Sequence, residues 1–208
     1  MNIDIMRLVV GPIRTNCYLI KNKLSDGVII VDPGGDEEVI ENRMLAYHMK
    51  PVAILLTHGH FDHIGAVNQL KSRFGVKVYA YQDEKEVLER PDINLSSMFE
   101  GPMSIKADVY LRDNEEFELD GIKFKTIYTP GHTIGSCCFY IENEKVLFSG
   151  DTLFAYSHGR TDFPTGSEGA IIRSITERLL KLESDVKVYP GHEDETTIGR
   201  EKMFYVIN

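Results

Sequence analysis

The chain has 208 residues, of which 42% are hydrophobic and 26% are charged, and its formal net charge is −9. Such values are typical of a globular protein with one buried core. Negative charge without a basic stripe argues against nucleic acid as a partner, and no apolar run approaches the ~20 residues of a membrane span. We expect one domain over residues 1–208, located in the cytoplasm because the N-terminus does not resemble a secretory signal.

The first half of the chain alternates between strand and helix patterns, which is typical of an α/β protein. In chain order we expect strands at residues 3–10, 16–21 and 28–31, a helix at 36–47, a strand at 52–56, a helix at 64–74, a strand at 76–80 and a helix at 83–89. Asp36 is a candidate N-cap of its helix, because acidic residues follow it in the first turn.

The second half begins with residues 92–106, which show little periodicity. We interpret this segment either as a lid beside a functional site or as a packed surface loop. Strands are expected next at 117–119, 122–128, 136–141 and 145–148, followed by an amphipathic helix at 168–182 and a last strand at 186–189. Asp120-Gly121 is the dipeptide of a tight hairpin turn, so strands 117–119 and 122–128 should pair.

Four side chains of the types that bind metal ions crowd into the run Thr57-His58-Gly59-His60-Phe61-Asp62-His63. Neutral imidazole and carboxylate are good ligands for zinc, iron and manganese. Buried polar groups at this density need partners. The run therefore predicts a metal site rather than a solvated loop.

Three further residues repeat one local pattern, in which a short apolar strand ends and a metal-binding side chain follows. His132 comes after Thr129-Pro130-Gly131, Asp151 after Ser149-Gly150, and His192 after Pro190-Gly191. Strands that end on one rim of a sheet can direct such side chains at one point, and glycine permits sharp turns and close backbone approach.

These seven residues suffice for two divalent ions, with zinc the first choice and iron or manganese as alternatives. His58, His60 and His132 could hold one ion, and Asp62, His63 and His192 the other. Asp151 could bridge both through its two carboxylate oxygens, since ions in two-metal sites lie roughly 3.5–4 Å apart.

The motif His58-x-His60-x-Asp62-His63, followed by His132, Asp151 and His192, resembles the metallo-β-lactamase-fold hydrolases. Pro130-Gly131-His132-Thr133, Ser149-Gly150-Asp151-Thr152-Leu153-Phe154 and Pro190-Gly191-His192 are similar to motifs of the glyoxalase II branch, as are Thr15-Asn16-Cys17-Tyr18 and Val31-Asp32-Pro33-Gly34-Gly35. The resemblance implies a four-layer αββα sandwich with the metal site at one edge between the two sheets.

Two departures from full-length glyoxalase II concern the recognition of glutathione. Those enzymes carry a C-terminal helical region that helps to bind glutathione, and we expect this chain to lack it. They also present a Lys and a Tyr after the bridging Asp, where this chain has Arg160 and Asp162. Arg160 could replace the Lys as an anion clamp, and His158 could line the same pocket. The chain resembles the short, single-domain glyoxalase II type.

This resemblance implies a binuclear metallohydrolase whose substrate is a small acyl-thiol such as S-D-lactoylglutathione. A hydroxide held between the ions would attack the thioester carbonyl, with Asp62 and Asp151 as catalytic residues. The alternatives are a mononuclear-iron persulfide dioxygenase that uses His58, His132 and Asp151, and a lactone or phosphodiester hydrolase of the same superfamily. A β-lactamase is less expected, because that subgroup usually carries Cys or Ser in place of Asp151.

Asp32 and the three cysteines remain outside this assignment. Asp32 either supports the metal ligands or stabilises the Asp-Pro-Gly-Gly turn. Cys137 and Cys138 are adjacent in a predicted strand, so their side chains should point to opposite faces. With Cys17 they do not form a disulfide framework, and we interpret all three as small buried hydrophobes.

Overall fold

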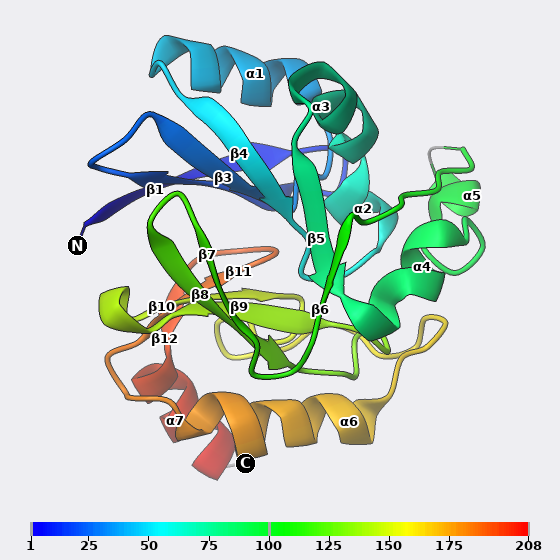
Figure 1. Cartoon of the computed structure of the whole chain (residues 1–208). Helices are drawn as coiled ribbons and strands as arrows, with labels where there is room; N and C mark the ends of the chain where they lie inside the picture. The colour runs from blue at the N-terminus through cyan, green and yellow to red at the C-terminus, as the bar shows by residue number, and fades with distance from the viewer. Residues whose placement is uncertain (1, 100, 208) are drawn as a thin grey trace.

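Two six-stranded sheets face each other, and helices cover the outer side of each sheet (Figure 1). The structure is a computed structural model that describes residues 2–99 and 101–207, the side chains of residues 206 and 207 excepted. The two sheets and their flanking helices form the predicted αββα sandwich. Within the described residues, no helix is both long and apolar enough to cross a membrane.

The first sheet contains the strands in chain order: β1 (Ile3–Val10), β2 (Thr15–Asn22), β3 (Gly27–Val31), β4 (Lys50–Leu55), β5 (Lys77–Tyr81) and β6 (Val109–Leu111). β1 to β3 are antiparallel, whereas β3 to β6 run parallel. The parallel pairs need crossovers, and α1 (Glu37–Ala46) and α3 (Val67–Phe74) supply two of them. Both helices lie on the outer face of this sheet (Figure 1).

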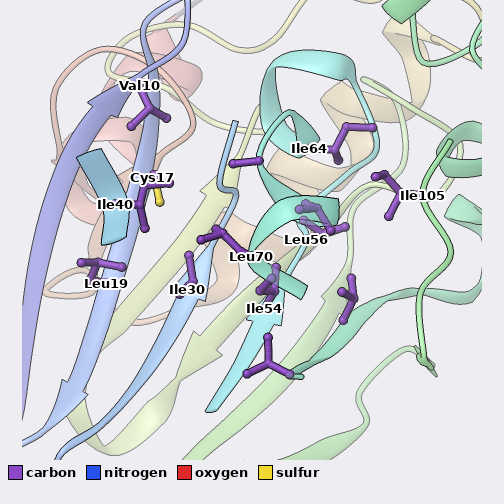
Figure 2. Packing of buried hydrophobic residues seen from close by; sticks show 14 of the residues in the cluster. Val10, Cys17, Leu19, Ile30, Ile40, Ile54, Leu56, Ile64, Leu70 and Ile105 are labelled. Atoms are coloured by element: carbon purple, nitrogen blue, oxygen red, sulfur yellow. The ribbon is translucent and has the colours of Figure 1, made fainter. Parts of the chain in front are cut away.

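The outer core of the first sheet forms because alternate strand residues point toward these helices. Figure 2 shows Leu19, Ile30 and Ile54 of the strands close to Ile40 of α1 and Leu70 of α3. All five side chains have 0% exposure. Burial of each contributes roughly 1.5–3 kcal/mol to the hydrophobic driving force, which holds the helices against the sheet.

The second sheet has the order β12-β11-β10-β9-β8-β7. Its strands are β7 (Glu116–Leu119), β8 (Ile122–Tyr128), β9 (Cys137–Ile141), β10 (Val146–Gly150), β11 (Lys187–Pro190) and β12 (Thr196–Thr197). Only β10 and β11 are parallel among these pairs. The hairpin β7–β8 turns at Asp120-Gly121, as predicted, with φ of 50° and 76°. α6 (Glu168–Arg173) and α7 (Ile198–Ile207) lie on its outer face (Figure 1).

The adjacent cysteines of β9 confirm the alternation of this strand. Cys137 packs in the core between the sheets with Phe124 and Phe148, whereas Cys138 packs in the outer core with Ile171 of α6. Cys17 lies in the outer core of the first sheet, close to Ile40 of α1 (Figure 2). Each of the three cores thus contains one buried thiol, and the interpretation as small core residues is confirmed.

The helix predicted at 64–74 is broken into α2 (Phe61–Ile64) and α3. The amide of Ala66 donates to Pro33 O at 2.9 Å, so it is not part of a continuous helical ladder. A Cβ on Gly65 would lie 2.4 Å from Gly34 O. The loop after β3 therefore presses on the chain at this point, a tertiary contact that periodicity alone does not reveal.

Asp36 occupies the predicted N-cap position of α1, with φ 50°, but its side chain makes no cap bond. Its Oδ2 instead accepts a hydrogen bond from the amide of Gly11. The carboxylate ties the β1–β2 turn to the start of α1.

The predicted helix 168–182 is helical but irregular. α6 passes into a π-helical turn over Ser174–Arg178 and a 3₁₀ turn over Leu179–Lys181. The hydroxyl of Thr176 donates to Ile172 O at 2.8 Å, a local bond that competes with the backbone ladder. The sequence analysis did not predict β6, β12 or α7. The strands β6 and β12 are very short, and α7 has a weak amphipathic pattern.

Candidate metal centre

The predicted metal-binding residues meet at one edge of both sheets, in loops that follow β4, β8, β10 and β11. Two glycines permit this close approach. A Cβ on Gly150 would lie 2.3 Å from Thr57 Oγ1, and one on Gly191 would lie 2.2 Å from Asp151 Oδ1. Gly150 also has a φ of 49°, which other residues rarely adopt.

The ligand atoms form three overlapping groups, within each of which all atoms lie within 4.8 Å of one another. The groups are His58, His60 and His132; Asp62, His63 and His192; and His58, His63 and Asp151. The first two are the triads expected from the sequence. Asp151 lies between them, with Oδ1 3.3 Å from His63 Nε2 and Oδ2 3.5 Å from His132 Nε2. The arrangement has room for one carboxylate shared by two cations.

Hydrogen bonds determine which nitrogen of His132 carries the proton. Its Nδ1 lies 2.7 Å from the carbonyl oxygen of Arg160. A carbonyl only accepts, so Nδ1 donates, and Nε2 of the neutral ring keeps its lone pair. That Nε2 lies 2.8 Å from His60 Nδ1. The two nitrogens lie at hydrogen-bonding distance, so the rings of His60 and His132 are in direct contact at the site.

Asp32 and Thr57 orient two other imidazoles. Asp32 Oδ2 accepts from His63 Nδ1 at 3.0 Å and from Thr57 Oγ1 at 2.6 Å, and its Oδ1 accepts from the Thr57 amide. Because the Thr57 hydroxyl donates to Asp32, its lone pair accepts from His58 Nδ1 at 3.1 Å. The neutral His58 ring therefore presents an unprotonated Nε2 to the site, and Asp32 holds the His63 ring with its Nε2 toward Asp151. Of the two interpretations of Asp32, the structure supports the one that concerns the ligands.

Among the described residues, four buried polar atoms at this edge make no hydrogen bond of normal geometry: His58 Nε2, His60 Nε2, His63 Nε2 and Asp151 Oδ1. Leaving buried polar atoms unpaired costs about 1–3 kcal/mol each, so a cluster of them indicates a missing partner. Three imidazoles and a carboxylate are ligands that zinc and iron prefer. The donor set fits divalent metal ions.

Burial keeps three of the imidazoles neutral. It lowers the pKa of His60 to about 3, with the neighbouring His132 as the second cause. It also lowers the pKa of His58, with a further contribution from His63, and that of His132. Neutral imidazole is the form that binds metal.

The carboxylates are ionised despite burial. Burial raises the pKa of Asp62, but the imidazoles of His63 and His192 outweigh it and lower the pKa to about 2. His63 and then His132 likewise hold the pKa of Asp151 well below its usual range. Ionised oxygens next to imidazoles give a site of mixed charge that a cation would complete.

Residues of β2 hold the second triad in place. Thr15 Oγ1 donates to Asp62 Oδ2 at 2.9 Å, and Tyr18 Oη donates to Pro190 O at 2.6 Å. Asn16 donates to Pro190 O and Glu193 O from Nδ2. Thr15-Asn16-Cys17-Tyr18 thus positions both Asp62 and the His192 loop.

The two predicted substrate-binding residues already have partners. Arg160 forms a two-bond pair with Asp162 and lies 3.9 Å from the ring centroid of Phe163. His158 contacts Tyr205 Oη through Nδ1 and Glu168 through Nε2. The loop is therefore fastened to α6 and α7. Contact of Arg160 and His158 with a substrate stays a prediction.

The first part of the segment 92–106, residues 92–99, packs beside α2, which carries Asp62 and His63. The amide of Phe61 donates to Asn94 O at 2.9 Å, and the Phe61 ring stacks on Phe99 at 4.7 Å between centroids. Within this segment α5 (Ser96–Phe99) exposes Met98 and Phe99. The segment is both anchored and adjacent to the site.

Sequence reasoning missed several supporting residues, namely Thr15, Thr57, Glu84, Thr133 and Ser136. Thr57 carried a signal, because it stands between a buried strand and the first histidine. Glu84 carried none: it is an acidic residue in a stretch predicted as an ordinary helix, and only the structure reveals that it is 1% exposed. Its carboxylate accepts hydrogen bonds from the loops that carry His58, His60 and His132.

Known proteins resemble the chain over nearly its whole length. A relative from Haemophilus influenzae, hydroxyacylglutathione hydrolase GloC, is 39% identical, with 97% of this chain and 95% of the relative covered. The structure of BLEG-1 B3 metallo-beta-lactamase is 38% identical, with 96% and 97% covered and a TM-score of 0.91. TTHA1623 in a di-iron-bound form is 32% identical, with 95% and 96% covered and a TM-score of 0.84.

The family model described as the metallo-beta-lactamase superfamily matches residues 10–192. This range includes all seven clustered His and Asp residues and both sheets except for the strand β12 and the residues of β1 before Val10. The layer order, the edge that carries the ligands and this match together show that the chain belongs to the metallo-beta-lactamase superfamily.

Proposed function

We propose that the chain is a metal-dependent thioester hydrolase of the glyoxalase II type, with hydroxyacyl-glutathione thioesters as the substrate class. The observation that carries the proposal is the convergence of buried, unpartnered imidazole nitrogens with Asp151 at one edge of the sandwich. The 39% identity to a hydroxyacylglutathione hydrolase over 97% of the chain supports the choice of substrate.

In this proposal His58, His60 and His132 hold one divalent ion, Asp62, His63 and His192 hold the second, and Asp151 contacts both. When bound, the ions supply a Lewis acid and lower the pKa of a bound water toward neutrality. Zinc is the expected metal, and the di-iron form of TTHA1623 makes iron the alternative to test.

Asp62 would position the attacking water. The contacts to its carboxylate from Thr15, His63 and His192 all involve Oδ2. Oδ1 therefore remains available to accept a hydrogen bond from the water and so to orient the lone pair of its oxygen. The departing thiol has a pKa of ~8.5 and leaves as a thiolate, so the chain needs no strong general acid.

The thiol half of the substrate has a suitable cleft beside His192. This cleft has a volume of about 430 Å³ and is lined by Arg7, Val9, Ile13, Arg14, Asn16, His192, Glu193 and Asp194. Arg7 is paired with Asp194 at 3.1 Å. No ion pair among the described residues involves Arg14, so its guanidinium is available for a carboxylate of glutathione.

Thiol release from S-D-lactoylglutathione tests the proposal, with metal-free protein and protein reconstituted with zinc or iron. We expect release only from the metal-loaded protein. Asp151→Ala should lose at least about 100-fold in kcat, because it removes the carboxylate between the two triads. No release from protein carrying two ions per chain would reject glutathione thioesters as substrates.

A second candidate follows from the 38% identity to BLEG-1, whose structure is described as a B3 metallo-beta-lactamase. Hydrolysis of a chromogenic cephalosporin by the same preparation tests it directly. Oxygen uptake with glutathione persulfide tests the iron-dependent dioxygenase alternative. A kcat/KM for thiol release that exceeds the values for cephalosporin hydrolysis and for oxygen uptake would favour the thioester assignment.

A further inference from the structure

Glu84 is a buried carboxylate that the proposed chemistry does not use. It lies in the 3₁₀ turn Gln82–Glu84, between β5 and α4 (Lys85–Glu89), and is 1% exposed. No ion pair within residues 2–99 and 101–207 reaches it. A buried carboxylate without a cation is costly unless hydrogen bonds compensate it, so its contacts need an explanation.

Three donors from two separate loops converge on this carboxylate. The amide of Gly59 donates to Oε1 at 2.7 Å, and the amide of Gly135 donates to Oε2 at 2.8 Å. The hydroxyl of Thr133 lies 2.9 Å from Oε1 and 2.8 Å from Oε2. Gly59 stands between His58 and His60. Thr133 and Gly135 follow a third histidine.

That third histidine is His132, so Glu84 fastens together the two loops that supply the three-imidazole triad. The loops lie 72 residues apart in sequence between His60 and His132. The other triad is held by different residues: Thr15 binds Asp62, Asp32 binds His63, and Tyr18 binds the carbonyl before the His192 loop. These contacts differ from those of Glu84, although Asp32 also orients His58 of the three-imidazole triad through Thr57.

The geometry requires both a carboxylate and two glycines. Glutamine would direct its NH₂ group at one of the amide donors, leaving that donor unsatisfied. A Cβ on Gly135 would lie 2.2 Å from Glu84 N, and one on Gly59 would lie 3.0 Å from Leu88 of α4. The loop of Gly135 therefore presses on the turn that carries Glu84, and the loop of Gly59 presses on α4, the helix that follows this turn.

We propose that Glu84 is a positioning residue for the metal site of His58, His60 and His132, and that it sets the affinity of this site without affecting the site of Asp62, His63 and His192. The inference rests on the proposed metal centre but not on the identity of the substrate. Partners that orient metal ligands typically contribute about 10- to 100-fold in metal affinity.

Cobalt titration against a competing chelator, in backgrounds that retain one triad, tests the proposal. His192→Ala retains the three-imidazole triad, and His60→Ala retains the other. Adding Glu84→Gln to the first background should weaken cobalt binding about 10- to 100-fold and shift the visible absorption bands of the bound ion. Adding it to the second background should change affinity by less than about threefold.

Glu41→Gln is the matched control. Glu41 of α1 is another buried carboxylate, paired with Arg73 at 2.9 Å in the outer layer. The Glu41→Gln substitution should lower the unfolding midpoint of the protein and leave the cobalt affinity of both triads unchanged. If Glu84→Gln does not fold, Thr133→Val removes one donor with little change of shape, and a smaller loss confined to the three-imidazole triad is expected.

The proposal would be overturned if Glu84→Gln lowered cobalt affinity equally in the His192→Ala and His60→Ala backgrounds. It would also be overturned if Glu84→Gln did not lower cobalt affinity in the His192→Ala background. If the wild-type protein binds no cobalt, the proposal fails together with the metal centre. The protein could instead release no thiol from lactoylglutathione, while Glu84→Gln still weakens cobalt binding only at the three-imidazole triad. That result would support the role of Glu84 and reject only the proposed substrate.

Discussion

Single residues decide which atoms face the metal site. Asp32 accepts from His63 Nδ1 and from Thr57, and Thr57 in turn accepts from His58. One carboxylate thereby orients two rings. Asp32, the residue directly after β3, can do this only because the parallel neighbour β4 ends beside it, as the bond from Asp32 N to Leu55 O shows.

Asp32→Asn should impair metal binding. The amide can replace one acceptor oxygen but places an NH₂ group against either Thr57 or His63, so we expect a loss of about 10- to 100-fold in zinc affinity. Zinc content after dialysis against a chelator measures this loss. Asp36→Asn is the control, because Asp36 contacts only the Gly11 turn. Full zinc retention in Asp32→Asn would contradict the assigned role.

Arg14→Ala should raise KM for S-D-lactoylglutathione with little change in kcat. A hydrogen bond to a charged group contributes about 1.5–3 kcal/mol, so the expected rise is about tenfold or more. Arg160→Ala is the comparison, because the Arg160 guanidinium is already paired with Asp162. Steady-state kinetics with metal-loaded protein measure both. A larger rise for Arg160→Ala would instead support the Arg160 clamp expected from the sequence.

At the scale of elements, the ends of strands bring ligands from distant segments together. β10 and β11 are parallel. β10 ends in Gly150, Gly191 directly follows β11, and a ligand comes after each glycine. Gly191 N donates to Gly150 O at 2.8 Å, which keeps the loops of Asp151 and His192 in contact. A side chain at Gly191 would overlap Asp151 and His63, and one at Gly150 would overlap Thr57.

Gly191→Ala should therefore lower both the stability of the protein and its affinity for metal ions. The new methyl group would lie 2.2 Å from Asp151 Oδ1, and overpacking of this kind costs about 1–3 kcal/mol. Gly169→Ala, in exposed α6 with only the flexible end of Arg173 at 3.4 Å, should stabilise the protein by about 0.4–1 kcal/mol. Urea unfolding of both variants measures these changes. Equal stability of the two would contradict the packing argument.

At the scale of the whole molecule, the site exists only when the two sheets are packed together. The strands β1 to β6 and their loops supply His58, His60, Asp62 and His63, and the second sheet supplies the other three ligands. Hydrogen bonds cross between the halves at this edge: Cys137 N donates to Thr57 O, and Asn16 N donates to Gly191 O. Docking of the sheets and assembly of the site should occur together.

The three cysteines report on that docking, because each lies in a different core and is fully buried. Burial raises the pKa of Cys17 and Cys137 well above the usual thiol value and that of Cys138 to about 12. At pH 8 all three are thus protonated and shielded. An aromatic disulfide reagent should label none in the native protein and three after unfolding; fast labelling of a native thiol would contradict this packing.

The sequence by itself determined the fold class, most strands and the seven ligand candidates, because strand periodicity and the motifs Thr57–His63, Gly131-His132, Gly150-Asp151 and Gly191-His192 are local. Only the tertiary structure decided how the ligands are supported. Thr57, Asp32 and Glu84 act through partners 25 to 51 residues away. The break at Gly65 and the missing side-chain cap bond of Asp36 have the same cause, since a contact from a distant loop outweighs local preference there.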